Sequence, residues 1–459
     1  MKVEREVAAG RAGPWREEEV RAALGLAPGE SDRVFSTIST DSRAIPPGAL
    51  FVALPGERFD GHDYLPAVAA AGAAAAIVRH GTVAVEGLDL LAVPDPLRAF
   101  GLLARARRRK LGGPVVAITG TNGKTSTKEM LAAAMGTRFV TYATRANLNN
   151  LVGVPLTILE APEAVEALVV EAGANSPGEI ARYREIIEPD VVVVTNAVAG
   201  HLEGFGSLNG VLEEKLSLTD GVALAVVGTD PPALAAGARR RAREVRTAGL
   251  LNAELVPDRV ELGPDARPRL TFGDTSFSLA ARGLHQADNA VRVWAVAEAL
   301  GLDLGAVGRA LEGFALPGGR GELIQAGGLT ILNDCYNANP QSFRSAIATA
   351  AALRGDRRLV FVAGTMRELG AAAPELHAEI ARELVALEPD LLAVVGEFVP
   401  ALAPHAGVLG DRLLTADDPP ALAPALAARL QGDEVVVLKA SRGVALERIL
   451  PALTAAGRQ

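Results

Sequence analysis

The amino-acid sequence predicts an α/β fold divided into three domains. The chain has 459 residues, which is too long for one ordinary hydrophobic core, and at about 150 residues per domain its length suggests three domains. Short aliphatic runs alternate with stretches long enough for helices, a pattern typical of parallel sheets covered on both faces. We therefore expect a small α/β domain in residues 1–111, a central parallel-sheet domain in residues 112–315 and a second α/β sheet in residues 316–459.

The composition narrows the class of partner. The formal net charge is −8, which argues against a protein held on nucleic acid by a general basic field, so we expect small-molecule partners. A single cysteine, Cys335, excludes an internal disulfide framework and a multi-cysteine metal site. The N-terminus leads into no apolar signal region, and no apolar run is long enough to span a bilayer. These features predict a cytoplasmic location.

The N-terminal segment combines helix, strand and loop patterns. Residues 17–24 have a helical pattern that Gly25 ends, and residues 50–54 form an apolar run typical of a strand. The polar, glycine-bearing stretch 56–64 predicts a loop, where binding groups often lie. The basic cluster 105–110 could attract phosphate, but a solvated helix end at a domain boundary is the simpler interpretation.

A glycine-rich loop after a short apolar run predicts a nucleotide triphosphate site. The apolar run is 115–119, and the loop consists of Gly120, Thr121, Asn122, Gly123, Lys124, Thr125 and Ser126. Loop amides and a helix N-terminus would face the phosphates, Lys124 would neutralise their oxygens, and the Thr125 hydroxyl would reach a magnesium ion. The alternative is an ordinary glycine turn. Ile118 stands where the general pattern has a glycine, which indicates a shorter variant of the loop.

Polar residues follow further apolar runs of the central segment. Glu171 comes directly after the run 168–170, and His201 follows the run 191–194. Ligands of parallel sheets bind beyond the carboxyl ends of the strands, where a carboxylate and an imidazole could hold magnesium. Lys215 lies in a helical pattern further along. The alternatives are a histidine that is hydrogen-bonded in a turn and a lysine that is solvated.

The C-terminal segment repeats the alternation of strands and helices. Its apolar runs are 330–332, 359–363, 391–395 and 435–438. Polar loops follow two of these runs, at 333–340 and 439–443. Two α/β domains that face each other form a cleft, and closure of a cleft over a nucleotide excludes water from phosphoryl transfer.

Together these stretches resemble the Mur ligases of peptidoglycan synthesis. The resemblance covers nearly the whole chain, and besides the phosphate loop it is carried by residues 40–43, 56–64, 147–150, 171–175, 201–207 and 336–340. It implies a phosphate-loop ATPase-type central domain, a Rossmann-like C-terminal domain and an N-terminal domain that binds a UDP-linked substrate. Within the family, the 336–340 stretch favours the branch that joins D-Ala-D-Ala to a UDP-N-acetylmuramoyl tripeptide.

The resemblance implies an ATP-dependent amide ligase that works through an acyl phosphate, with ATP and two magnesium ions, and we expect a monomer. The expected catalytic residues are Lys124, Glu171, His201 and Lys215. The expected metal ligands are Thr125, Glu171, His201 and Lys215, the last as a carbamate formed with carbon dioxide. The carbamate matters because an unmodified ammonium has no lone pair for a metal ion.

The same resemblance assigns the binding residues. ATP contacts are expected from the phosphate loop, Asn289, Arg320 and Asp334. Substrate contacts are expected from Asp41, Ser42, Arg43, Asn147, Leu148, Asn149, Asn150, Tyr336, Asn337, Asn339, Lys439, Ser441 and Arg442. The sequence departs from the family pattern at Leu216 and Ser217, at Gln286 and at Thr365, and none of these changes removes a group that the chemistry requires.

Two other functions stay open at this point. A related Mur ligase could add a single amino acid, although the Asp-Asn-Pro-Arg segment usual in the enzyme that adds the third amino acid is absent. A phosphate-loop switch from another class would hydrolyse nucleotide without needing a carboxylate substrate. Cys335 is interpreted as a tolerated small residue, because the chemistry needs no nucleophilic side chain.

Overall fold

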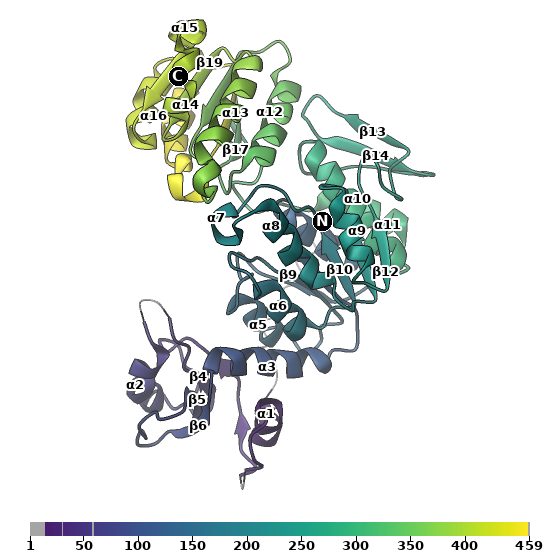
Figure 1. The fold of residues 1–459 in the computed structure, drawn as a ribbon, viewed down its shortest axis with the longest axis vertical. Coiled ribbons are helices and arrows are strands. Elements are labelled where there is room, and N and C mark those ends of the chain that lie inside the picture. The colour runs from purple at the N-terminus through teal and green to yellow at the C-terminus, as the bar shows by residue number, and fades with distance from the viewer. Residues whose placement is uncertain (1–13, 30, 57–58, 458–459) are drawn as a thin grey trace. The chain divides into compact units, whose positions relative to one another are not determined.

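The computed structural model describes residues 14–29, 31–56 and 59–457 (Figure 1). Residues 1–6, where the sequence shows no signal region, lie outside the described residues. Residues 57 and 58 of the expected loop 56–64 lie outside them as well. Contacts group the chain into two compact units. Of the described residues, the first unit contains those up to 118 together with 138–174 and 178–192, and the second contains 119–137, 175–177 and those from 193 onward.

The N-terminal part of the first unit is a small α/β layer. Its elements are β1 (Trp15–Arg16), α1 (Glu17–Leu24), β2 (Val34–Phe35), β3 (Ile38–Ser39), β4 (Leu50–Val52), α2 (Leu65–Ala70), β5 (Ala75–Arg79), β6 (Asp89–Val93) and α3 (Pro96–Arg109). Strands β3, β4, β5 and β6 pair in that order and in parallel. Phe51, Leu65 and Val68 form the core between this sheet and α2.

Local sequence explains where these helices begin and end. Helix α1 ends at Gly25, whose φ of 66° is the left-handed conformation that suits a glycine cap. Helix α3 begins after Asp95, whose Oδ1 accepts hydrogen bonds from the backbone N–H groups of Leu97 and Arg98. Pro96 occupies its first turn, where a missing N–H has no cost. The predicted helix at 17–24 is confirmed.

The basic cluster at the end of α3 corrects an expectation. Arg108 is buried, and its guanidinium donates to the carbonyl oxygens of Ile187 and Glu188 and to the carboxylate of Asp190. Arg105 and Arg109 both bind the Glu188 carboxylate at 2.7 Å, and this pairing lowers the Glu188 pKa to about 2. The interpretation as a solvated helix end is therefore wrong for Arg108, although Arg109 and Lys110 are exposed. The arginines fasten α3 to the end of α6 (Glu179–Ile187).

Strands and helices alternate through the central segment. The elements are β7 (Val115–Thr119), α4 (Lys124–Met135), β8 (Thr141–Ala143), α5 (Gly153–Leu159), β9 (Ala167–Glu171), α6, β10 (Val191–Val194), α7 (Leu202–Phe205), α8 (Leu208–Leu216), β11 (Leu224–Val227), α9 (Ala233–Arg239) and β12 (Glu244–Thr247). Six strands form one sheet in the order β12-β11-β10-β7-β9-β8. Strand β9 pairs in parallel with β7 and β8, and β11 pairs in parallel with β12. The predicted aliphatic strands are confirmed.

A small antiparallel sheet follows, and the sequence did not predict it. Its strands are β13 (Arg259–Leu262), β14 (Pro268–Phe272) and β15 (Thr275–Ser278). The helices α10 (Leu284–Ala299) and α11 (Leu304–Gly313) come next in the chain. These strands alternate polar and apolar residues over a few positions, so they lack the continuous aliphatic runs that marked the other strands. Phe272 stacks on Trp294 of α10, with ring centroids 4.6 Å apart.

The C-terminal segment forms the second α/β sheet. Its elements are β16 (Glu322–Ala326), β17 (Leu329–Asp334), α12 (Pro340–Arg354), β18 (Leu359–Ala363), α13 (Ala373–Ala386), β19 (Leu391–Val395), α14 (Phe398–Leu402), α15 (Ala406–Leu409), β20 (Leu413–Ala416), α16 (Pro419–Ala427), β21 (Val435–Lys439) and α17 (Leu450–Ala456). The strand order is β16-β17-β21-β18-β19-β20, parallel except for the antiparallel edge pair of β16 and β17.

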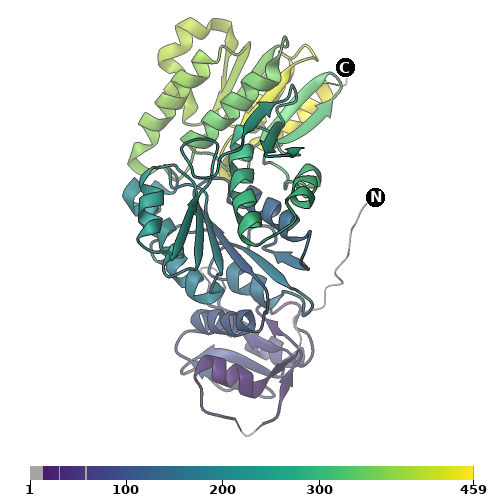
Figure 2. The same ribbon diagram turned by 90° about the vertical axis from the view of Figure 1, so that its right-hand side faces the viewer.

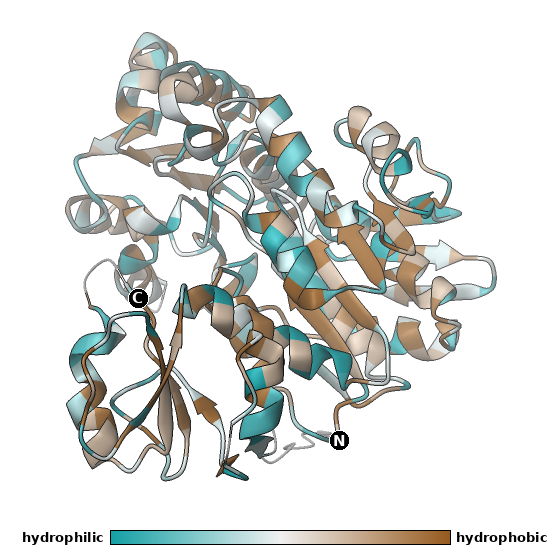
Figure 3. Cartoon of the chain, turned by 60° about the horizontal axis from the view of Figure 1, so that its bottom comes forward, coloured by the Kyte–Doolittle hydropathy of each residue, from teal (hydrophilic) through white to brown (hydrophobic). Residues whose placement is uncertain are grey.

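Helices cover both faces of this sheet, which is coloured green to yellow in Figure 2. Phe361 packs with α12 and α13 in one buried cluster, whereas its neighbours Val360 and Val362 pack in a second cluster with residues of α16 and α17. A strand that is buried on both faces must be apolar along its length, and many arrows in Figure 3 have the brown colour of hydrophobic residues. The domain boundaries at 111/112 and 315/316 stay predictions.

Candidate active site

Glycine is required at two positions of the loop between β7 and α4. Gly120 has a φ of 144° and Gly123 a φ of 80°, conformations that other residues rarely adopt. A Cβ on Gly120 would collide with Thr195 Oγ1, and a Cβ on Gly123 would collide with the side-chain amide of Asn289. Helix α4 begins at Lys124, so the positive end of its dipole lies at this loop.

Lys124 lies across the loop that precedes it. Its Nζ donates to the carbonyl oxygen of Gly120 at 2.7 Å and to that of Thr121 at 3.0 Å. Thr125 and Ser126, in the first turn of α4, are both buried. The loop thus combines an ammonium, two hydroxyls and a helix N-terminus, which are the groups that a triphosphate with its cation requires.

Asn122 connects the loop to residues far away in the sequence. Its Nδ2 donates to Asn339 Oδ1 at 3.1 Å and to Gln341 Oε1 at 2.8 Å, and Asn339 Nδ2 donates back to Asn122 Oδ1 at 2.6 Å. The backbone N–H of Asn122 donates to Asn196 Oδ1 at 2.9 Å. Asn339 also caps α12, because its Oδ1 accepts from the N–H of Ser342. The phosphate loop therefore contacts the start of a C-terminal helix.

Asn289 of α10 lies against the phosphate loop at Gly123. It is buried, its Nδ2 donates to Gln286 Oε1 at 3.3 Å, and its Oδ1 accepts from Arg292 at 3.4 Å. Arg292 is in turn paired with Asp288 at 2.6 Å. The structure thus brings Asn289 to the loop, as its expected role in binding ATP requires, and Gln286 helps to hold it there.

The His201 ring lies against the Glu368 carboxylate. His201 Nδ1 lies 2.5 Å from Glu368 Oε2, and the backbone N–H of Glu203 donates to the Glu368 carbonyl at 3.3 Å. The hydrogen bond from His201 lowers the Glu368 pKa, and the charges of Arg367 and Lys124 lower it further. His201 is therefore hydrogen-bonded in a turn, but its partner comes from a different sheet.

Lys215 is almost completely buried in α8, with 1% of its surface exposed. Its Nζ lies 5.2 Å from the centroid of the Phe205 ring, and Phe205 belongs to the short helix that His201 begins. The alternative of a solvated lysine is wrong. Burial of a charged ammonium is costly, which is consistent with a modified or tightly partnered side chain.

Glu171 and Asn149 meet within the first unit. Glu171 is 2% exposed, its Oε1 accepts from Asn149 Nδ2 at 2.8 Å, and its backbone N–H donates to Thr144 Oγ1 at 3.0 Å. Asn150 was expected to contact substrate, but its Oδ1 accepts from the N–H groups of Val152 and Gly153 at the start of α5. The Asn150 side chain therefore has a structural task in this unit, although Asn150 and Asn147 are both exposed.

The loops after β17 and β21 lie together. Lys439 Nζ donates to Asp334 Oδ2 at 2.6 Å and to the carbonyl of Asn337 at 2.8 Å. The Arg320 guanidinium stacks on the Tyr336 ring at 3.7 Å, and Arg442 lies 5.2 Å from the same ring. Expected ATP contacts and expected dipeptide contacts thus share one surface.

Ser441 and Cys335 also lie in these loops. Ser441 Oγ donates to the carbonyl of Ala338 at 3.3 Å and accepts from the Arg367 N–H at 2.9 Å. Cys335 is buried, and burial raises the pKa of its thiol well above the usual range. A thiol that resists ionisation is a poor nucleophile.

In the N-terminal turn from Asp41 to Arg43, the two charged side chains pair with each other. The Arg43 guanidinium donates to both carboxylate oxygens of Asp41 at 2.8 Å, and these bonds lower the Asp41 pKa to about 2. Both side chains are exposed, at 87% for Arg43 and 46% for Asp41. Ser42 lies between them at the surface of the same unit. The turn presents charge to solvent.

Three family models match consecutive parts of the chain. They are described as "Mur ligase family, catalytic domain" over residues 34–108, "Mur ligase middle domain" over residues 118–297 and "Mur ligase, glutamate ligase domain" over residues 319–442. The UDP-N-acetylmuramoyl-tripeptide--D-alanyl-D-alanine ligase of Escherichia coli (strain K12) is 34% identical, over 92% of this chain and 94% of its own. The chain belongs to the Mur ligase family.

Solved structures agree with this assignment. Crystal structure I of MurF from Acinetobacter baumannii matches with a TM-score of 0.87 and 29% identity, covering 97% of this chain and 100% of that one. The MurF ligase of Thermotoga maritima in complex with ADP matches with a TM-score of 0.81 and 29% identity, covering 92% and 97%. The predicted three-domain α/β architecture is therefore confirmed.

Mur ligases use magnesium, and the donor groups of this chain suit that ion. Glu171 supplies a buried carboxylate and Thr125 a buried hydroxyl, and both are oxygen donors that magnesium prefers. The Nδ1 of His201 contacts the Glu368 carboxylate. Among the described residues, no hydrogen bond to its Nε2 is present. In the described part of the chain no three His, Cys, Asp or Glu side chains form a metal cluster, so oxygen atoms of the nucleotide would have to complete the coordination.

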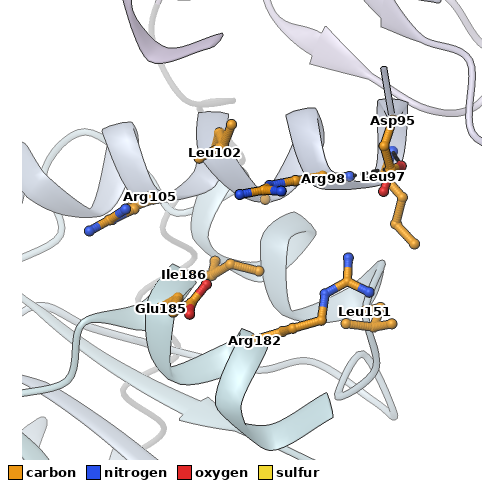
Figure 4. Close-up of a pocket in the computed structure, with 10 residues that line it drawn as sticks. Asp95, Leu97, Arg98, Leu102, Arg105, Leu151, Arg182, Glu185 and Ile186 are labelled. Carbon is orange, nitrogen blue, oxygen red and sulfur yellow. Dashed lines mark hydrogen bonds between the residues drawn. The ribbon is translucent and has the colours of Figure 1, made fainter. Parts of the chain in front are cut away.

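The first unit of this Mur ligase also contains a groove between α3 and α6 (Figure 4). Its volume is about 400 Å³, and it is lined by Asp95, Leu97, Arg98, Gly101, Leu102, Arg105, Leu151, Arg182, Glu185 and Ile186. None of the predicted site residues lines it. The charges at its rim are mixed, with three arginines and two carboxylates, so it has no clear preference for one sign of ligand.

Sequence reasoning missed several residues that contact the predicted site. They are Thr195, Asn196, Gln341 and Glu368. Asn196 follows the strand β10 in the same way that other predicted residues follow their strands, so the strand-end rule could have found it. Glu368 follows β18 at a longer distance, and only the fold shows that its carboxylate reaches His201.

Proposed function

We propose that this Mur ligase joins D-Ala-D-Ala to a UDP-N-acetylmuramoyl tripeptide, converting ATP to ADP and phosphate. Relatives with that name are 31% and 34% identical over more than nine tenths of the chain. The structural observation that supports this proposal is the reciprocal amide pair of Asn122 and Asn339. It joins the loop that would bind ATP to the loop that would face the dipeptide.

The first step activates the carboxylate of the tripeptide. One carboxylate oxygen attacks the γ-phosphorus of ATP, the bond from phosphorus to the bridging oxygen breaks, and ADP leaves. Lys124 would offset the charge that develops on the phosphoryl oxygens. Arg320 would contribute a second cation. Its Nε is buried without a hydrogen-bond partner among the described residues, so it could donate to a phosphate oxygen.

The second step forms the amide. The dipeptide amine attacks the carbonyl of the acyl phosphate, the amine loses a proton, and the tetrahedral intermediate collapses with release of phosphate. Tyr336, Asn337, Ser441 and Arg442 would hold the dipeptide, and Lys439 fixes their loops by binding Asp334 and the carbonyl of Asn337. Asp41, Ser42, Arg43 and the stretch Asn147 to Asn150 would bind the UDP-linked substrate in the first unit.

Magnesium would be held by Thr125, Glu171, His201 and a carbamylated Lys215, and we propose two ions. When bound, these ions supply positive charge that offsets the negative charge of the phosphates. Carbamylation would convert the ammonium of the buried Lys215 into an anion whose oxygen atoms can bind a cation. Asn289 would then position the adenine side of the nucleotide from its place beside Gly123.

We further propose that the protein acts in the cytoplasm as a monomer. Its expected substrates are small, water-soluble molecules. Among the described residues, no helix combines the length and the apolar character needed to cross a membrane.

The decisive experiment gives purified protein ATP, magnesium and UDP-N-acetylmuramoyl tripeptide, with and without D-Ala-D-Ala, and identifies the product by mass. We expect a product heavier by the dipeptide minus one water, together with phosphate release that requires both substrates. Release that depends on a free amino acid instead would indicate another Mur ligase. Release that ignores both peptide substrates would indicate a nucleotide-hydrolysing switch.

A further inference from the structure

Glu368 has no role in the chemistry proposed above, yet its carboxylate contacts the His201 ring. The carboxylate comes from the loop after β18 in the C-terminal sheet, and the imidazole begins helix α7 of the central segment. The two atoms that meet, Nδ1 and Oε2, lie 2.5 Å apart. This contact therefore joins a residue expected to bind metal to the domain expected to bind the dipeptide.

Both residues have an unusual backbone conformation. His201 has a φ of 55° and Glu368 a φ of 65°, and a left-handed conformation costs a residue with a side chain about 1 kcal/mol or more. Such conformations persist where the surroundings fix them and are concentrated at functional sites. Here the backbone N–H groups of Gly204 and Phe205 donate to the His201 carbonyl at 3.0 and 3.2 Å, and that of Glu203 donates to the Glu368 carbonyl.

Hydrogen bonds of the two preceding residues, Met366 and Arg367, also fix the loop that carries Glu368. The N–H of Met366 donates to the buried ring of His377 at 2.9 Å, and the N–H of Arg367 donates to Ser441 Oγ at 2.9 Å. The Arg367 guanidinium donates to the carbonyl of Gly443 at 2.8 Å. The chain just before Glu368 is thus held by the same loop, 439–443, that is expected to face the dipeptide.

A carboxylate on Nδ1 decides which ring nitrogen can bind a cation. It keeps the proton of a neutral imidazole on Nδ1, so that the lone pair is on Nε2 and the ring is fixed in direction. In metal sites such carboxylates typically contribute tenfold to hundredfold to metal affinity. The alternative is a plain ion pair between two domains, which would hold the domains together without affecting the metal.

We propose that Glu368 is a positioning residue that orients His201 Nε2 toward the cation bound with the nucleotide. This inference rests on the proposed function, because it takes His201 as a metal ligand. Its consequence is a link between two events: His201 is oriented only when the loop of the C-terminal domain is docked on α7. Binding of the dipeptide by that domain would then favour binding of the cation, and the reverse.

The first test reads the tautomer of His201 without metal or activity. The chain has six histidines, so the imidazole nitrogens of ¹⁵N-labelled protein can be assigned by NMR with a His201→Gln variant. At pH 8.5, above the usual imidazole pKa of about 6.5, we expect the Nδ1–H form in the unmodified protein. Glu368→Ala should lose this preference, while Glu368→Gln should keep it, because the amide oxygen can still accept the hydrogen bond.

The second test measures binding of Mn²⁺ in the presence of ADP by electron paramagnetic resonance. We expect about tenfold to hundredfold weaker binding in Glu368→Ala and a smaller loss in Glu368→Gln. Glu375→Gln, which removes the same charge from an exposed position of α13, is the matched control and should leave the affinity unchanged. Circular dichroism establishes that each variant is folded.

The outcomes separate the possible errors. An unchanged tautomer in folded Glu368→Ala overturns the positioning role, even if Mn²⁺ binding weakens. A changed tautomer with unchanged Mn²⁺ affinity leaves only the plain ion pair and overturns the link to the cation. Unchanged Mn²⁺ binding in His201→Gln overturns the metal role of His201, whereas failure of the ligase itself would appear in the mass assay with the unmodified protein.

Discussion

The phosphate loop and the turn from Asp41 to Arg43 were both expected to bind charged parts of a nucleotide, but they are held differently. The phosphate loop is fixed by residues from distant parts of the chain, including Thr195, Asn289 and Asn339. The Asp41 to Arg43 turn is fixed by its own exposed ion pair. A preorganised loop can stabilise a transition state, whereas an exposed turn contributes mainly to binding.

The largest expected effect of this difference is at Lys124. Lys124→Ala removes the ammonium that lies across the phosphate loop, so we expect turnover to fall by on the order of 10³-fold in the phosphate-release assay. Lys110→Ala, at the exposed end of α3, is the control and should leave turnover nearly unchanged. Unchanged turnover in Lys124→Ala would refute the assignment of the phosphate loop.

Lys215→Ala should have the next largest effect. If the buried lysine is a carbamate, its loss removes an anionic metal ligand, and we expect turnover to fall by on the order of 10²-fold, the size typical for one electrostatic contact of a transition state. Added acetate or propionate should restore part of the activity by supplying a carboxylate to the cavity. A folded variant that binds ATP but shows no rescue would count against the carbamate.

The sequence predicted the groups that a strand or a short motif places, and it missed those that only the fold brings close. Aliphatic runs located the strands, and Glu171 and the phosphate loop followed because polar residues at strand ends share one rim. Glu368 lies 167 residues after its partner His201, so no local pattern could show their contact. The antiparallel strands β13 to β15 were missed because their alternation is short and partly exposed.

The same limit explains two interpretations of single side chains. Lys215 has an ordinary helical context, and only the packing of α7 on α8 shows that it is buried. Arg108 belongs to a basic run that resembles a solvated helix end. Its guanidinium, however, donates to a carbonyl oxygen at the C-terminal end of α6 and to a carboxylate just after it. Burial depends on elements distant in sequence, and a charge pattern alone does not contain that information.

Gly123 offers a way to disturb the phosphate loop without removing a charge. In Gly123→Ala the new methyl group must occupy the space of the Asn289 amide at a φ of 80°, so we expect a loss of about 1–3 kcal/mol in unfolding free energy and weaker ATP binding. Thermal unfolding and ATP titration measure the two effects. Adding Asn289→Ala should recover part of the stability but none of the ATP affinity, and equal recovery of both would show that Asn289 only packs.

The pair of Asn122 and Asn339 tests the contact between the loop and α12. A double-mutant cycle of Asn122→Ala and Asn339→Ala should give a coupling of about 1 kcal/mol in unfolding free energy, because the two amides exchange hydrogen bonds. Since Asn339 also caps α12, its single variant should cost more than that of Asn122. Purely additive effects would mean that the two loops do not stay in contact in solution.

The smallest effect is expected at the Asp41 to Arg43 turn. Arg43→Ala should raise the KM for the UDP-linked substrate and leave kcat unchanged, because an exposed arginine that binds substrate and transition state equally contributes only to binding. NMR titration should give Asp41 a pKa of about 2, returning toward 3.8 in Arg43→Ala. Because the folded pKa is depressed, the stabilising contribution of Asp41 is present above pH 3.8 and is lost as the pH falls toward 2. Exposure to solvent keeps this contribution small, so a change in kcat, or a loss of stability as large as that of Gly123→Ala, would show that the turn is held by more than its own ion pair.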